Sequence, residues 1–293
     1  MQQFFQQLVF GLATGGIYAS LALALVLIYR STKVINFAQG ELAMFTTYIA
    51  WELVHRGLGY WGAFFLTLLI AFGGGVALER VVIRPVETQG VLTIVIVTIG
   101  LFILVHGAAA WIWGPEIKSF PSPFPTSTVD IGGVRFSWQD FGTIGVSLAS
   151  VAVLAVFFRF TKVGLALRAA AVNPAASRIT GLRVSWLLAL GWGLAAMLGA
   201  IAGLMIVPTV FLDPNMMQPV LIYAFAAAVL GGIESPLGAV VGGLAIGVLV
   251  NMIGTYVGWV TAELRLPVAL AVLLAVLLVR PVGLFGRVAV RKV

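Results

Sequence analysis

The sequence predicts an all-α membrane protein, a polytopic transmembrane helical bundle of about 8 to 9 spans that forms one domain over residues 1–293. Of the 293 residues, 61% are hydrophobic and 9% are charged, which leaves too little polar surface to cover a soluble globule. Apolar runs of roughly 20 residues recur, the length at which a helix crosses the hydrocarbon core. The runs at 21–28 and 268–279 do not alternate polar and apolar residues, so strands of a membrane barrel are not expected.

Nine apolar segments are expected to form the helices of this bundle. The N-terminal MQQFFQQLVF lacks the positive charge that opens a cleavable signal peptide, so the first segment is expected to be retained. Segment 219–233 is short for a crossing and is followed by GGIESPLGAVVGG, so a tight hairpin and a broken helix both remain open there. The segments lie at residues 5–29, 34–54, 60–82, 91–113, 141–160, 184–207, 219–233, 237–260 and 264–279.

The distribution of lysine and arginine predicts the orientation of the bundle, because short loops rich in these residues stay in the cytoplasm. With the N-terminus outside and the C-terminus cytoplasmic, most of the 17 basic residues fall inside. The inner group is Arg30, Lys33, Arg80, Arg84, Arg159, Lys162, Arg168, Arg178, Arg183, Arg280, Arg287, Arg291 and Lys292, and the outer group is Arg56, Lys118, Arg135 and Arg265.

The composition also limits the chemistry of the chain. It has no cysteine, and its two histidines, His55 and His106, are not spaced as metal ligands. Without a nucleophile and base pairing or a phosphate-binding GxxxxGK[ST] loop, no catalytic residue, metal site or bound cofactor is expected. The net charge of +7 is spread over several loops, which argues against a nucleic-acid partner.

Two long loops lie on opposite faces in this topology. The external loop, residues 114–140, has prolines and turn residues that suit an ordered cap, a partner contact or a plain connector. The cytoplasmic loop, residues 161–183, contains a predicted short helix that Asn173 caps, Pro174 opens and Gly181 ends. Such a helix either docks on a partner or lies at the lipid headgroups, held by its flanking arginines.

A polar motif opens the second segment, where charge is expensive. In STKVINFAQGELAM, residues 31–44, the local interpretation is that Asn36 caps the helix, Gln39 completes a capping box and Glu41 complements the helix dipole. The functional interpretation is that Asn36, Gln39 and Glu41 line the inner mouth of a translocation pathway, with Gly40 allowing close helix approach. The two interpretations are compatible.

Other polar and small residues are expected to serve mainly in packing. His106 and Asn251 can each hydrogen-bond a neighbouring helix, while Glu234 and Ser235 lie in a helix break or a cytoplasmic turn. Glycine pairs at four-residue spacing predict close helix contacts within the core, or with a second membrane subunit. These pairs are Gly199 and Gly203, Gly238 and Gly242, Gly243 and Gly247, and Gly254 and Gly258.

Three stretches resemble a known family. Residues 31–44, AAAVNPAASRITGL at 169–182 and AFAAAVLGGIESPLGAVVGG at 224–243 are similar to the permease subunits of ATP-binding-cassette (ABC) importers, specifically LivH-type branched-chain amino acid permeases. The resemblance covers nearly the whole chain. It implies that the cytoplasmic loop supplies the helix that couples the permease to the ATPase, formed by Asn173, Pro174, Ala175, Ala176, Ser177, Arg178, Ile179, Thr180 and Gly181.

The resemblance also implies partners and a substrate. The partners would be a second homologous permease, two ABC ATPases that hold ATP and Mg, and a soluble external substrate-binding protein, in a bacterial or archaeal inner or plasma membrane. The substrates would be leucine, isoleucine and valine, with urea, short amides or other amino acids as alternatives. An ion-coupled secondary transporter would need buried ion ligands, for which Glu41 is the one well-placed acid. A channel would need a filter or a charged ring, which the sequence lacks.

Overall fold

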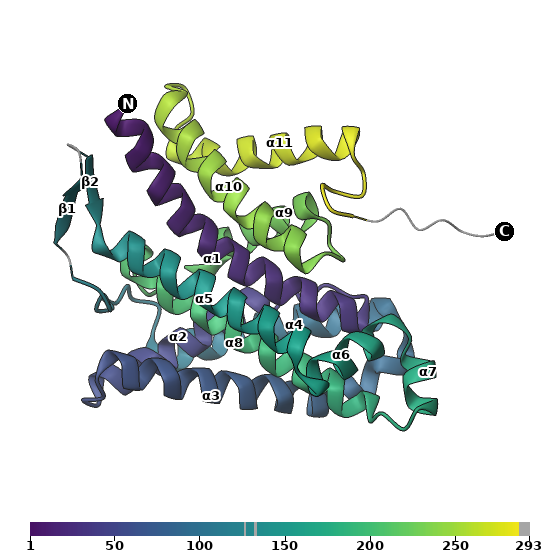
Figure 1. Cartoon of the computed structure of the whole chain (residues 1–293). Helices are drawn as coiled ribbons and strands as arrows, with labels where there is room; N and C mark the ends of the chain where they lie inside the picture. The colour runs from purple at the N-terminus through teal and green to yellow at the C-terminus, as the bar shows by residue number, and fades with distance from the viewer. Residues whose placement is uncertain (126, 132–133, 287–293) are drawn as a thin grey trace.

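The computed structural model describes residues 1–125, 127–131 and 134–286, so Arg287, Arg291 and Lys292 of the inner basic group lie outside the described residues. It confirms the helical bundle, in which most helices run roughly along one direction (Figure 1). The elements are α1 (Gln2–Thr32), α2 (Gln39–His55), α3 (Tyr60–Leu78), the π-helical turn η1 (Glu79–Ile83), the 3-10 segment η2 (Arg84–Gln89), α4 (Val91–Trp113), β1 (Thr128–Ile131), β2 (Val134–Ser137), α5 (Trp138–Phe160), α6 (Lys162–Val172), α7 (Pro174–Ile179), α8 (Val184–Val210), α9 (Met217–Gly231), α10 (Pro236–Tyr256), η3 (Ala262–Leu264) and α11 (Arg265–Val279).

Each of the nine predicted segments corresponds to a helix. Within the described residues, seven helices are long and apolar enough to cross a membrane, and α9 is a shorter apolar helix. The 17-residue α2 is also short, and many of its residues are buried. α9 and α10 pack against each other after a turn at Gly232, whose φ of +102° favours glycine, so this region is a tight hairpin.

The centre of the bundle is formed by α1 and α8, the most buried of the long helices. α1 packs on α10, where side chains built on Gly243 or Gly247 would clash with the backbone of Ala19 or Gly15. By contrast, α4, α5 and α11 are mostly exposed, and their apolar faces suit contact with lipid. The fold therefore has two buried central helices and lipid-compatible helices around them.

The predicted close contacts are confirmed at three of the four glycine pairs, and their partners lie within the chain. Gly199 and Gly203 of α8 face Gln39, Ala43 and Thr47 of α2. Other pairs behave similarly: Gly238 and Gly242 face α9, whereas no neighbour lies near a side chain built on Gly258. At α2–α8 and α1–α10 the neighbouring helix of the same chain occupies the space beside these glycines, and contact of these spans with a second permease stays a prediction.

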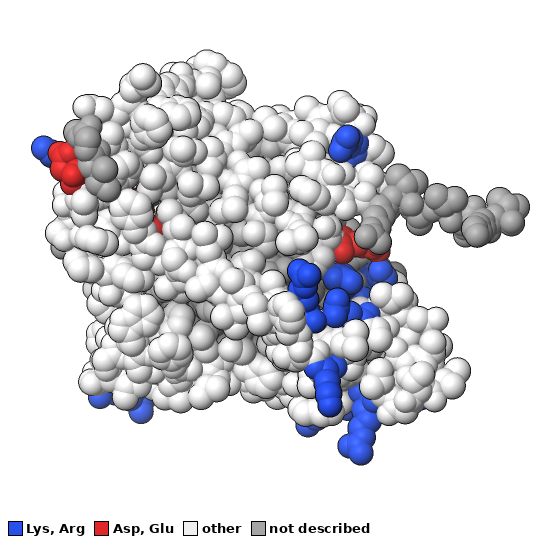
Figure 2. Space-filling view, viewed as in Figure 1, with Lys and Arg blue, Asp and Glu red and all other residues white. Residues whose placement is uncertain are grey.

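Loops that were predicted on one side of the membrane do contact one another. At one end Lys33 pairs with Glu234, with 2.8 Å between Nζ and Oε1. At the other end Lys118 and Leu212 exchange two backbone hydrogen bonds of 2.9 Å. Basic side chains gather at the end that carries α6 and α7 (Figure 2). The alternation of the helices therefore agrees with the predicted topology, and the side that faces the cytoplasm stays a prediction.

The predicted external loop is ordered where the structure describes it, and it adds a hairpin that the all-α prediction did not contain. β1 and β2 pair antiparallel, with Thr128 opposite Ser137. Upstream of the hairpin the loop packs over α2 and α3, where Trp51 Nε1 donates to the Ser119 carbonyl at 3.1 Å. The Phe120 ring is 5.8 Å from that of Tyr60. These contacts favour a cap over a plain connector.

Candidate functional site

The polar motif after α1 forms a non-helical segment that folds back into the bundle. α1 ends at Lys33, whose φ of +56° turns the chain, and α2 begins only at Gln39. Asn36 Oδ1 accepts from the backbone N–H of Ala38 at 3.1 Å. The first turn of α2 has no side-chain cap, so the predicted capping box is wrong. The reason is local, because the Asn36 carboxamide closes a turn two residues on, which leaves the Gln39 side chain free to reach another helix.

Gln39 joins this segment to α8. Its Nε2 donates to the Ala195 carbonyl at 3.0 Å, and its Oε1 accepts from Asn36 Nδ2 at 3.1 Å. Both side chains are buried. Ala195 is about 17 Å from the start of α8 at 1.5 Å per residue, so this Asn36–Gln39–Ala195 clamp lies deep in the bundle.

The first turns of two short helices meet beside the clamp. A side chain on Gly40 would lie 3.2 Å from Leu221 of α9 and 3.5 Å from the Met217 carbonyl. Gly40 is the second residue of α2 and Met217 the first of α9. The positive ends of two helix dipoles therefore converge inside the protein.

Glu41 lies at this junction and faces α4. Its Oε2 is 3.1 Å from His106 Nδ1, with the Glu41 side chain 1% exposed and that of His106 30% exposed. Gln218 in the first turn of α9 is within hydrogen-bonding reach of the same carboxylate. The four predicted pathway residues, Asn36, Gln39, Gly40 and Glu41, are thus brought together, but all are buried, so this conformation is closed around them.

The deeper polar residues each bond a neighbouring helix, as their packing interpretation predicts. His106 of α4 contacts Glu41 of α2, and Asn251 of α10 donates to Thr14 Oγ1 of α1 at 3.0 Å. Sequence reasoning missed the partners Gln218 and Thr14. Gln218 was detectable as a polar residue beside an apolar segment, whereas nothing in the sequence pairs Thr14 with Asn251.

The predicted coupling helix is present as α7. Asn173 Oδ1 accepts from the Ala176 N–H at 3.0 Å, and Gly181 follows the helix with a φ of +83°. The residues of α7 are exposed except Ser177. Ile179 is 89% exposed, so this apolar side chain is hardly covered by the rest of the described chain. The preceding α6 was not predicted, and it projects with α7 from one end of the bundle (Figure 1).

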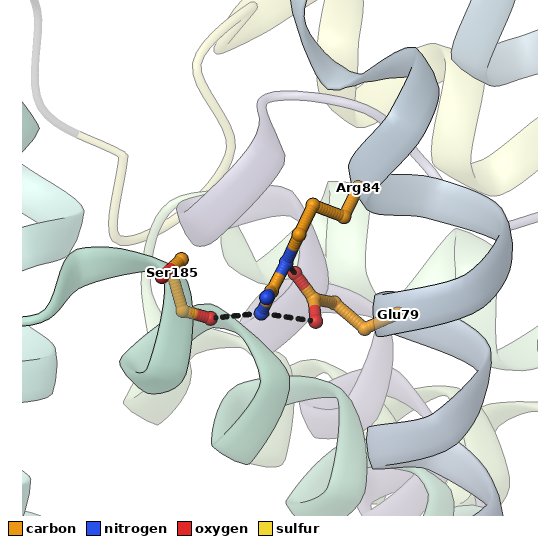
Figure 3. A network of polar contacts seen from close by, with 3 residues as sticks. All are labelled: Glu79, Arg84 and Ser185. Atoms are coloured by element: carbon orange, nitrogen blue, oxygen red, sulfur yellow. Dashed lines mark hydrogen bonds and ion pairs between the residues drawn. The ribbon is translucent and has the colours of Figure 1, made fainter.

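An ion pair directly after α3 is hydrogen-bonded to the start of α8. Glu79 in the π-helical turn η1 is 1% exposed, and its Oε2 lies 3.0 Å from Arg84 Nη2. The same Nη2 donates to the Ser185 carbonyl at 2.9 Å (Figure 3). π-helical turns often occur at functional sites. The first turn of α8, directly after α7, is therefore attached to α3.

Arginines surround a hollow next to α7. Arg80 and Arg84 line it from η1 and η2, and Arg178 and Arg183 line it from the α7 side. The Arg80 guanidinium stacks 4.9 Å from the centre of the Trp186 ring. The sequence analysis placed all four arginines in the inner basic group, and only Arg178 within the predicted coupling helix.

Glu234 and Ser235 form a turn between α9 and α10. Ser235 Oγ accepts from the Gly238 N–H at 3.0 Å and caps α10. Glu234 is exposed beside Lys33, whose hydrogen bond and positive charge lower the pKa of the carboxyl group. Of the two interpretations left open, the structure favours the turn.

Comparison with known proteins shows which family and which relatives the chain is similar to. The family model described as "Branched-chain amino acid transport system / permease component" matches residues 7–277. The chain is 31% identical to the high-affinity branched-chain amino acid transport system permease protein LivH of Salmonella typhimurium, covering 99% of this chain and 98% of that protein. The permease protein BraD of Pseudomonas aeruginosa gives the same identity and coverage. A probable LivH of Methanocaldococcus jannaschii is 30% identical over 80% of this chain and 76% of that protein.

Proposed function

Because the chain belongs to the family of branched-chain amino acid transport permeases, as the sequence motifs predicted, we propose that it is the permease subunit of an ATP-driven importer of branched-chain or related amino acids. It would work by alternating access, with ATP hydrolysed by separate subunits. The observation that carries this proposal is α7, a capped and exposed helix whose end leads within a few residues into the buried helix α8.

The contacts of α8 suggest how movement of α7 would reach the membrane interior. Docking of an ATPase on α7 would push on the first turn of α8, which Arg84 attaches to α3 through the Ser185 carbonyl. Further along α8, the Ala195 carbonyl holds Gln39 at the start of α2. A tilt of α8 would therefore shift α3 and the start of α2 together, because both are hydrogen-bonded to it.

The translocation pathway would pass between the first turns of α2 and α9. An amino acid carries an ammonium and a carboxylate group. Glu41 would attract the ammonium group once the contact with His106 opens, and the two converging helix starts would attract the carboxylate. Urea or a short amide would gain less from these charges, so the geometry favours an amino acid.

The complete importer would contain the partners that the resemblance implies: a second homologous permease, two ABC ATPases with ATP and Mg, and a soluble external substrate-binding protein. The chain itself would lie in the inner or plasma membrane of its cell with the N-terminus outside and the C-terminus in the cytoplasm. The cluster of basic side chains around α6 and α7 supports this orientation (Figure 2).

The proposal is tested by changing Ile179 to glutamate in the tagged chain and measuring how much ATPase subunit co-purifies in mild detergent. Ile179 is exposed, so the fold should survive while an apolar docking contact is lost. The matched control is Ile117→Glu in the predicted external loop, where the side chain is 73% exposed. We expect I179E to lose most of the ATPase and of leucine uptake, and I117E to keep both. Uptake and co-purification that survive in I179E would refute the docking role of α7.

A further inference from the structure

An apolar groove runs over α1 between α5 and α10. Its cavity volume is about 160 Å³. Its floor includes Leu23 and Leu27 of α1, and its sides include Leu154 and Phe158 of α5 and Val240 of α10. Such a groove beside the lipid-facing helix α5 suits a hydrocarbon chain.

Two arginines close the groove at the end of the bundle where basic side chains gather. Arg30 lies in the last turn of α1, and Arg168 lies on α6. Among the described residues neither forms an ion pair with a carboxylate, and the nearby Glu234 is already paired with Lys33. Two guanidinium groups at the mouth of one apolar groove repel each other unless an anion lies between them.

The spacing of these groups fits one molecule that is anionic at one end and apolar at the other. From Arg30 to Leu23 the groove follows α1 for about 10 Å at 1.5 Å per residue. The arginines lie where the last turn of α1 leaves the membrane, the depth of lipid phosphates. A protein partner would have to bring its own carboxylate to this depth, whereas the bilayer supplies a phosphate there.

We propose that this groove binds an anionic phospholipid, with its phosphate held by Arg30 and Arg168 and one acyl chain lying along α1. Arginine suits this role because its planar guanidinium group pairs with two phosphate oxygens at once. Bound in this way, the lipid bridges α1 and α6. Because α6 leads directly into α7, the lipid would also brace the predicted coupling loop against the bundle.

The test measures lipid binding to the full chain purified in a neutral detergent, so it does not depend on transport. Phosphatidylglycerol that remains bound is quantified by mass spectrometry, and the thermal unfolding midpoint is measured with added phosphatidylglycerol, phosphatidylcholine, glycerophosphoglycerol or inorganic phosphate. We expect phosphatidylglycerol alone to raise the midpoint. The double variant Arg30→Gln/Arg168→Gln should retain about tenfold less of this lipid, since two charge-assisted contacts are lost.

Two further variants separate the groove from general charge and from folding. Arg159→Gln removes a basic residue of the same predicted face that does not line the groove, and it should keep the lipid. Ala155→Trp places a ring in the groove from its exposed side and should lose the lipid although both arginines remain.

Three outcomes would overturn the proposal. Undiminished phosphatidylglycerol in the double arginine variant would show that these residues do not hold it. An equal rise of the midpoint with inorganic phosphate would make the site one for a free anion. If Ala155→Trp kept its lipid but lost a co-purifying permease, the groove would be a protein interface instead.

Discussion

Replacing Gln39 with leucine measures how much the clamp between α2 and α8 contributes to the free energy of unfolding. The substitution keeps a similar volume but removes the hydrogen bond to the Ala195 carbonyl and the acceptor of Asn36 Nδ2. A hydrogen bond between membrane helices contributes about 0.6–2 kcal/mol. Leaving the buried Asn36 amide unsatisfied costs about 1–3 kcal/mol more. The free energy of unfolding should therefore fall by about 2–5 kcal/mol.

The assay is unfolding of the purified chain in mixed micelles by titration with a denaturing detergent, followed by circular dichroism. Gln6→Leu, the same change at an exposed position of α1, is the matched control and should leave the unfolding free energy nearly unchanged. In the assembled transporter, Q39L should also lower the uptake per ATP hydrolysed, because α8 and α2 would no longer move together. A Q39L chain as stable as Q6L would refute the inference that the clamp holds the start of α2.

Three other predictions concern packing, topology and pH. Gly243→Leu should prevent close approach of α1 and α10, because its side chain would meet the backbone of Ala19, and the folded yield in a detergent extract should fall sharply. A single cysteine at Ala176 of this cysteine-free chain should react with an impermeant reagent only from the cytoplasmic side, and labelling from outside alone would reverse the orientation. Lys33 lowers the pKa of the Glu234 carboxyl. This exposed ion pair contributes under about 1 kcal/mol to the free energy of unfolding. The contribution is present at neutral pH and is lost as pH falls through the lowered pKa. Comparison of Lys33→Gln with wild type should therefore show a stability difference at pH 7 that disappears in acid once the Glu234 carboxyl is protonated, and a difference that grows in acid would contradict the sign.

Local features of the chain were predictable because their cause lies within a few residues. Asn173, Pro174 and Gly181 specify the start and end of α7 through a side-chain cap, a missing N–H and a positive φ, and α7 forms between them. The nine apolar segments likewise correspond to helices, since length and hydropathy alone decide whether a helix can lie in lipid. The hairpin at 128–137 was not predicted although both strands alternate polar and apolar residues, because each strand has only four residues, which is too short for the alternation to stand out.

The partners of the polar and small residues were decided only by the tertiary structure. The residue pattern was enough to predict that Gln39 and Glu41 lie at the start of a membrane helix and that Gly199 allows a close approach. It left open that Gln39 would reach α8 instead of capping its own helix, and that Glu41 would meet His106. In an apolar interior a buried polar group is stabilised by a partner within about 3 Å, and that neighbour is set by how distant helices pack.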